Sequence, residues 1–172
     1  DSWGKKLLSI LKNEGINIEA INIIDNHPTT LKQRIYSDGK QVARLDTEKI
    51  IDWQPDSGIK YNYSDYDIII LSDYNKGVLN HLWFSMNNLD NVIVDPKKDA
   101  FSHYRKANII TPNLNELQRA SKIKIKDNKS IVDACNELIQ ECNFNYIVAK
   151  KGDKGMTIVG KDNFVKHIEA HP

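Results

Sequence analysis

The chain has 172 residues, a length that suits one α/β domain with a sizeable core. Charged residues make up 27% of the sequence, and the formal net charge at pH 7 is +1. This near balance of charge gives no electrostatic argument for binding nucleic acid or an anionic membrane surface. No apolar run approaches the roughly 18 residues that a membrane-spanning helix needs, and no signal peptide is visible.

The amino-terminal residues predict a helix followed by a strand. Apolar residues recur at helical spacing over 3–13, where Asp1 or Ser2 can serve as the N-cap and Gly15 can end the helix. Apolar and polar residues then alternate over 16–24, which is typical of a strand with one buried face.

Residues 30–46 predict a β-hairpin, because Asp38-Gly39 is a turn dipeptide that favours positive φ. A two-residue turn at this position would pair Arg34 with Ala43 and leave Arg34 and Arg44 on opposite faces. Both arginines can share a face only if the hairpin is bulged or has a longer loop. The alternative to any functional role for this hairpin is a solvated amphipathic element.

The remaining residues alternate between predicted strands and helices. Residues 47–66 are poorly patterned, and we expect a short helix within a loop there. Strands are predicted over 67–71 (fully buried), 92–94, 109–110, 146–149 and, as a closing hairpin, 156–159 with 164–168. Helices are predicted over 78–88, 101–106, 113–121 (capped by Asn113) and 130–142. The alternation predicts a three-layer α/β domain with a mostly parallel sheet.

The two cysteines, Cys135 and Cys142, lie in one predicted helix. Their spacing places the Cα atoms roughly 10 Å apart along the helix axis. A disulfide needs a separation below about 7 Å, so we expect two buried free thiols, consistent with a reducing cytoplasm.

Two predicted strands end in a polar residue and a proline. Asp95-Pro96-Lys97 follows the run at 92–94, and Thr111-Pro112-Asn113-Leu-Asn-Glu116 follows Ile109-Ile110. Open α/β sheets place ligands at the carboxyl ends of their strands. We therefore expect Asp95 and Lys97 to meet Asn113 and Glu116 in one crevice.

These motifs resemble those of the ribokinase-type (PfkB) sugar kinases. The loop Ser72-Asp-Tyr-Asn-Lys-Gly77 is similar to that of the D-glycero-β-D-manno-heptose 7-phosphate kinase branch, and Lys32-Gln-Arg34 with Arg44-Leu-Asp46 is similar to its lid. The resemblance covers nearly the whole chain in the same motif order. It implies a ribokinase-like fold and transfer of the ATP γ-phosphate, with Mg²⁺, to the anomeric hydroxyl of heptose 7-phosphate. The product, the 1,7-bisphosphate, would serve ADP-heptose and lipopolysaccharide core synthesis.

For the nucleotide, the predicted site begins at Asn113 and Glu116, which share one face at a helix start. A carboxylate there can hold Mg²⁺ through water, whereas the alternative reading is a simple capping box. The segment Lys150–Gly155 resembles the family's Thr-x-Gly-x-x-Gly loop, with lysine where threonine is usual. The resemblance implies nucleotide or Mg²⁺ contacts from Asn113, Leu114, Asn115, Glu116, Lys151, Gly152 and Gly155.

For the sugar phosphate, Asp73 can accept hydrogen bonds from sugar hydroxyls, and Lys76 and Lys97 can form ion pairs with a phosphate through their mobile ammonium groups. The alternative for each lysine is plain solvent exposure. The substrate-binding residues implied are Lys32, Arg34, Arg44, Asp46, Ser72, Asp73, Tyr74, Lys76, Gly77, Asp95 and Lys97.

The family's Gly-Ala-Gly-Asp motif, which supplies an anion hole and the base Asp, has no match, because the sequence contains no Gly-x-Gly. We therefore expect residues 1–172 to be the central part of a kinase domain, inactive alone, with the base Asp beyond Pro172 and the amino-terminal sugar strands also outside. A fused adenylyltransferase and the oligomeric state stay open, although lids of this fold often pair in a homodimer. The alternatives are another sugar or nucleoside kinase of the same fold and a non-catalytic binding or dimerisation module.

Overall fold

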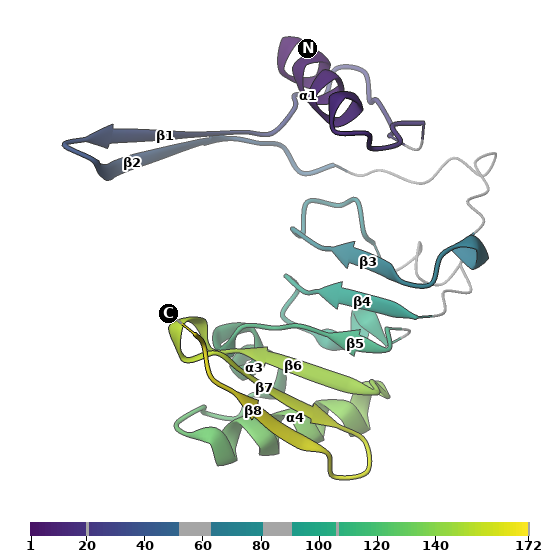
Figure 1. The fold of residues 1–172 in the computed structure, drawn as a ribbon, viewed down its shortest axis with the longest axis vertical. Coiled ribbons are helices and arrows are strands. Elements are labelled where there is room, and N and C mark those ends of the chain that lie inside the picture. Colours follow the sequence, from purple (N-terminus) through teal and green to yellow (C-terminus); the bar gives the residue numbers. More distant parts are fainter. Residues whose placement is uncertain (20, 52–62, 81–90, 106, 172) are drawn as a thin grey trace. The chain divides into compact units, whose positions relative to one another are not determined.

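The structure is a computed structural model that describes residues 1–19, 21–51, 63–80, 91–105 and 107–171. It divides into two compact units, Asp1–Ile51 and Asp52–Pro172, which Figure 1 shows in sequence colours. The first unit holds helix α1 (Ser2–Asn13) and a hairpin of β1 (Leu31–Ser37) and β2 (Lys40–Thr47). The second unit holds the larger sheet.

Helix α1 is confirmed, together with its cap. The Asp1 carboxylate accepts hydrogen bonds from the backbone N–H of Gly4 and of Thr29, both at 2.8 Å. Gly15 lies just beyond the helix at φ +72°. The strand predicted over 16–24 is wrong: none of the described residues of this segment pairs with a neighbouring strand, and a strand persists only with such a neighbour.

The hairpin is confirmed, and it has the bulge that would bring the two arginines to one face. Its turn places Asp38 at φ 49° and Gly39 at φ 74°. The register then shifts between Ile35 and Tyr36, so that Val42 has no partner and Arg34 lies opposite Arg44. Directly opposed residues of an antiparallel pair point to the same face.

The second unit is built on a six-stranded sheet in the order β3-β4-β5-β6-β7-β8. Strands β3 to β6 are parallel, and β7 and β8 close the sheet as an antiparallel hairpin. The strands are β3 (Ile69–Ser72), β4 (Val92–Asp95), β5 (Ile109–Ile110), β6 (Tyr146–Lys150), β7 (Met156–Gly160) and β8 (Val165–Ile168). The mostly parallel sheet is therefore confirmed.

Helices α3 (Leu114–Ser121) and α4 (Asn128–Cys142) pack together against one face of this sheet. Short 3₁₀ turns lie at η1 (Tyr63–Asp65), η2 (Phe101–Tyr104) and η3 (Gly152–Lys154). Of the three layers expected, the described residues show the sheet and this helical layer. Val78–Asn80 are not helical, and the rest of the helix predicted over 78–88 lies outside the described residues, as does most of 47–66.

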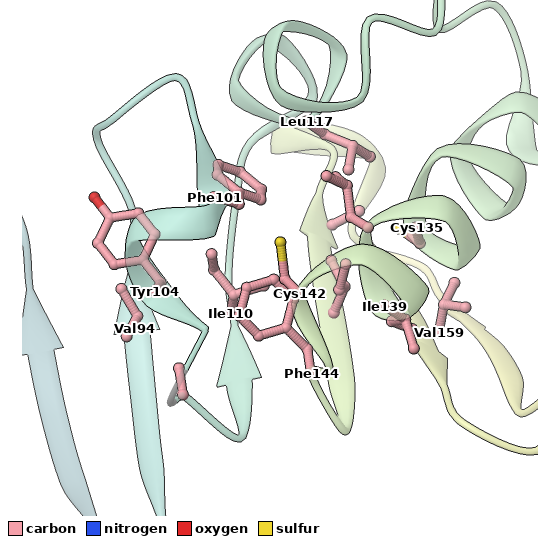
Figure 2. Packing of buried hydrophobic residues seen from close by; sticks show 14 of the residues in the cluster. Val94, Phe101, Tyr104, Ile110, Leu117, Cys135, Ile139, Cys142, Phe144 and Val159 are labelled. Atoms are coloured by element: carbon pink, nitrogen blue, oxygen red, sulfur yellow. The ribbon is translucent and has the colours of Figure 1, made fainter. Parts of the chain in front are cut away.

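The core lies between the sheet and α3 and α4, where alternate strand residues such as Val94, Ile110 and Val159 are buried (Figure 2). The expectation of a fully buried strand over 67–71 is wrong. Strand β3 is the sheet's edge, only its Leu71 is buried, and Ile70 is 70% exposed. An apolar run has the same composition at an edge as at the centre of a sheet, so composition did not show this.

Cys135 and Cys142 are free and buried on α4, as their spacing predicted. No helix in the described part of the chain is long and apolar enough to cross a membrane.

Candidate functional site

The carboxyl ends of the parallel strands bring the sequence motifs together. Ser72 and Asp95 are register partners at the ends of β3 and β4, and the N–H of Asp73 donates to the carbonyl of Asp95 at 3.0 Å. The N–H of Lys150, at the end of β6, donates to the carbonyl of Pro112 at 2.8 Å. Thr111 Oγ1 donates to the Asp95 carboxylate and Lys97 Nζ to the Glu116 carboxylate, both at 3.1 Å, so the two proline motifs meet at one edge as predicted.

Glu116 lies at the centre of this edge. It is 4% exposed and forms a capping box with Asn113. The Glu116 carboxylate accepts from the N–H of Asn113, and the N–H of Glu116 donates to Asn113 Oδ1, both at 2.9 Å. The other carboxylate oxygen accepts from Lys97 Nζ at 3.1 Å. The capping box left open by the sequence is thus present, and a cation already lies against the buried carboxylate.

A magnesium ion would have to share Glu116 with these partners. Both carboxylate oxygens are engaged, so the residue fits a cation held through water, as Mg²⁺ commonly is, once Lys97 moves aside. Within the described residues, no three His, Cys, Asp or Glu side chains gather as a metal-binding group. Water molecules and nucleotide phosphates would be the ion's other ligands.

Asp95 joins three strand ends. Its carboxylate accepts from Thr111 Oγ1 at 3.1 Å and forms an ion pair with Lys150 Nζ. Lys150 is the last residue of β6, so its side chain crosses the end of β5 to reach β4. The lysine at the usual threonine position therefore carries a positive charge into the predicted crevice.

Asp73 is buried at 5% exposure, and both carboxylate oxygens are engaged. One accepts from the Tyr104 hydroxyl at 2.5 Å and the other from the N–H of Asn75 at 2.6 Å. The Tyr104 oxygen in turn accepts from the N–H of Lys98 at 3.1 Å and of Lys97 at 3.3 Å. In this conformation Asp73 holds its own loop, which differs from the sugar contact that the sequence suggested.

Tyr104 is a residue of this site that sequence reasoning missed. It lies in a short turn between two motifs, beside Phe101, where a buried aromatic residue is typical of the core. Burial first, and then the hydrogen bond to Asp73, raise its pKa above the usual range. Its hydroxyl therefore stays protonated and remains a donor.

The remaining residues of the loop after β3 surround this network. Ser72 is exposed, Tyr74 is 66% exposed, and Lys76 is half-buried. Gly77 takes φ +98°, which a residue with a side chain rarely adopts. These residues can face a ligand at the strand ends, whereas Asp73 is buried beneath them.

The hairpin of the first unit gathers four predicted site residues on one face. Asp46 accepts from Lys32 Nζ at 3.0 Å and from Arg44 Nε at 2.9 Å. The hydrogen bond from Lys32 lowers the pKa of Asp46, and the same bond raises the pKa of Lys32. Arg34 lies opposite Arg44 on this face, so the hairpin presents a charged surface by itself.

Comparison with known proteins decides the family. The model of the pfkB family of carbohydrate kinases matches residues 1–172. The chain belongs to the pfkB family. Relatives named "Bifunctional protein HldE" are 31% identical over 99% of this chain in Rhodospirillum rubrum and 32% identical over 96% in Aliarcobacter butzleri. The chain spans 37% of the length of each of these curated relatives.

Solved structures support the pfkB fold. Ribokinase from Thermotoga maritima matches with a TM-score of 0.70 and 18% identity, over 100% of this chain and 57% of that one. Arabidopsis thaliana ribokinase, solved with ribose and ATP, matches with a TM-score of 0.72 and 17% identity, over 100% and 59%. The ribokinase-like α/β fold expected from the sequence is confirmed.

The glycine loop of this pfkB chain follows β6 directly. The N–H of Lys151 donates to the carbonyl of Gly155 at 2.8 Å, which closes the loop on itself. Gly152 takes φ +63° in open space, whereas a Cβ on Gly155, at φ +83°, would meet the carbonyl oxygen of Ile168 at 2.0 Å. Gly155 is therefore required by backbone packing against β8, and Gly152 only by its conformation.

The other predicted nucleotide residues begin helix α3. Leu114 is half-buried and Asn115 is exposed in its first turn. An isolated bridge joins Asn113 to Lys150, so the glycine loop begins beside this helix start. The structure thus brings together the predicted nucleotide residues of the second unit. The lid residues belong to the first unit.

Two hollows of about 310 Å³ and 300 Å³ lie elsewhere. The first is lined by apolar residues of α1 and of 21–24, and the second by residues of α3, α4 and η2. Neither is lined by the strand-end motifs, so side-chain chemistry, and not depth, identifies the candidate site.

Proposed function

We propose that the protein carrying this chain transfers the γ-phosphoryl group of ATP to the anomeric hydroxyl of D-glycero-D-manno-heptose 7-phosphate, giving the 1,7-bisphosphate. The observation that carries the proposal is the contact of Lys97 with Glu116, 3.1 Å apart, at the carboxyl ends of adjacent parallel strands. Phosphoryl transfer depends on positioning and on counter-charge for the phosphates. This contact supports the proposal because it joins a mobile cation to a buried carboxylate, the two kinds of group that the reaction would use.

On the nucleotide side, the start of α3 and the glycine loop would hold the phosphates. Backbone N–H groups at a helix start favour anions, and Lys151 and Lys150 add positive charge beside them. Mg²⁺, when bound near Glu116, would neutralise charge on the phosphates. Asn113 keeps the carboxylate in place through the capping box.

On the sugar side, Lys97 and Lys76 would meet the 7-phosphate. Lys97 is about half exposed at its side chain, so its ammonium can leave Glu116 for a phosphate. Ser72, Tyr74, Gly77 and Asp95 would line the sugar pocket, with Asp73 holding their loop. The charged face of the hairpin would supply the lid residues that the family resemblance implies.

The motif order supports the heptose phosphate over other sugars. The loop Ser72–Gly77 carries the resemblance to the heptose branch, and the relatives at about 30% identity bear one name. Other sugar and nucleoside kinases of the fold, and a non-catalytic module, are the competing readings. An ATP-using enzyme with buried free thiols would suit the reducing cytoplasm expected from the sequence.

The test uses the full-length protein that carries this chain, with ATP, Mg²⁺ and a panel of heptose, hexose and pentose phosphates and nucleosides. Phosphorus NMR should detect a new anomeric phosphate on heptose 7-phosphate and much slower turnover of the rest. A better substrate elsewhere in the panel would replace the heptose assignment. ADP formation from none of them, with ATP binding intact, would favour the non-catalytic module.

A further inference from the structure

Tyr104 is buried at 0% exposure in the turn η2, between the two proline motifs. Figure 2 shows its ring in the apolar cluster and its hydroxyl oxygen pointing away from the labelled apolar side chains. Phe101, in the same turn, packs against the ring edge to face, with centroids 6.3 Å apart. The aromatic ring alone would fill this position in the hydrophobic core, so the hydroxyl group requires a separate explanation.

That hydroxyl joins two loops through one oxygen atom. It donates to Asp73 at 2.5 Å and accepts from the backbone N–H of Lys98 at 3.1 Å and of Lys97 at 3.3 Å. Asp73 closes its own loop by accepting from the N–H of Asn75. The loop after β3 and the turn after β4 are thus held at a fixed separation.

A buried polar group is costly unless it is hydrogen-bonded, and each partner here would lose a bond if the hydroxyl were removed. The N–H groups of Lys97 and Lys98 both point to the tyrosine oxygen, so the backbone from which the Lys97 side chain extends is fixed by it. Lys76 lies in the other loop. The two lysines proposed for the sugar phosphate therefore depend on one tether.

We propose that Tyr104 is a positioning residue that sets the spacing of the loop after β3 and the turn after β4, and thereby the placement of Lys76 and Lys97 around the phosphate of the acceptor sugar. This inference rests on the proposed function, since it assigns these lysines to the sugar phosphate. A misplacement of about 1 Å can cost a hundredfold in a reaction that depends on geometry.

The test compares Tyr104→Phe with Phe101→Leu in the full-length protein. Tyr104→Phe should raise KM for the sugar phosphate about ten- to a hundredfold and leave KM for ATP within about twofold. Phe101→Leu removes packing from the same turn without touching the tether, so it should lower Tm with both KM values near wild type. An unchanged sugar KM in Tyr104→Phe, or an equal change in both variants, would overturn the proposal.

The partner residue provides a second measurement. In an Asp73→Ala background the link between the two loops is already cut, so adding Tyr104→Phe should raise the sugar KM by much less than it does in the wild-type background. Full additivity of the two effects would contradict the tether.

Amide hydrogen exchange separates failure of this inference from failure of the proposed function. In Tyr104→Phe the amides of Lys97, Lys98 and Asn75 should exchange faster, whereas those in β6 should not. If the wild-type protein phosphorylates no sugar phosphate but these amides respond, the proposed function is wrong and the tether remains. If it does phosphorylate one and the amides do not respond, the tether is wrong.

Discussion

The ammonium of Lys97 lies 3.1 Å from the carboxylate of Glu116, a residue that also caps helix α3 through Asn113. This contact joins the turn after β4 to the start of α3. A cation proposed for the sugar phosphate and a carboxylate proposed for the magnesium ion are thus partners before either ligand is present. Their separate roles can be distinguished by replacing them one at a time.

Replacing Lys97 should affect the sugar phosphate. In the full-length protein, Lys97→Ala should raise KM for the sugar phosphate about ten- to a hundredfold, because a hydrogen bond to a charged group is worth about 1.5–3 kcal/mol. KM for ATP should change much less, and Lys76→Ala should behave similarly. The matched control is Lys124→Ala, an exposed lysine in the loop before α4. Steady-state kinetics measure this, and an effect confined to ATP would reassign Lys97 to the nucleotide.

Replacing Glu116 by Gln distinguishes its two roles. Glutamine can still serve in a capping box, so Glu116→Gln should change the melting temperature little. Because the negative charge is lost, kcat should fall and the dependence of the rate on Mg²⁺ concentration should weaken. A magnesium titration with a thermal scan measures both. If Tm falls while the response to magnesium stays normal, Glu116 is only a cap.

The like-charged pair Arg34 and Arg44 lies directly across the hairpin. Such a pair is destabilising when the two charges are opposed on one face. Asp46 pairs with Arg44, and we propose that Arg34 meets a ligand of opposite charge. Arg34→Gln should therefore leave the hairpin at least as stable as before and still raise KM for the sugar phosphate. Lys40→Gln, near the hairpin tip, is the matched loss of one positive charge. Equal KM values in the two variants would assign the hairpin to the solvated alternative.

The two loop glycines should differ in their tolerance of a side chain. Gly152→Ala should cost about 1–2 kcal/mol, since its positive φ is the only obstacle. Gly155→Ala should cost more, because its Cβ would lie 2.0 Å from the carbonyl oxygen of Ile168. Urea unfolding of both variants measures the difference. Equal losses of stability would show that the close approach to the end of β8 is absent in solution.

The sequence could predict the structural features that depend only on residues a few positions apart. Asn113 and Glu116 form the capping box that their spacing indicates, and the dipeptide Asp38-Gly39 makes the turn. The contact between Lys97 and Glu116 followed from the rule that strand ends meet at one edge of a parallel sheet, but distant contacts outside that rule were not predictable. Asp73 and Tyr104 are 31 residues apart, and nothing near either one predicts their hydrogen bond.

The errors along the strands have a similar cause. Residues 16–24 alternate apolar and polar side chains like a strand, yet none of the described residues among them pairs with a neighbouring strand. The sequence predicts that Ile70 is buried, although it is exposed because β3 is an edge strand. Whether a strand has neighbours depends on the rest of the sheet and not on its own residues. A bulge in the hairpin was foreseen only as one of two options, and the sequence did not indicate that Val42 would be the extra residue.

The last prediction concerns Cys135, whose pKa is raised to about 12 by burial in the core of α4. In the unfolded chain the thiol ionises near the ordinary cysteine pKa of 9.0. Above that pH the unfolded state loses a proton that the folded state keeps, so the folded state loses stability as pH rises. The contribution is fully present below about pH 9 and is lost between there and pH 12, by up to about 1.4 kcal/mol per pH unit.

Replacing Cys135 by Ala removes this group, so the free energy of unfolding should fall less steeply from pH 9 to 10.5 than in wild type. Tyr104 contributes a decline of the same sign at higher pH in both proteins, and the difference between the two curves isolates the thiol. Parallel curves from urea titrations at each pH would mean that the Cys135 thiol ionises in the folded protein as readily as in the unfolded chain.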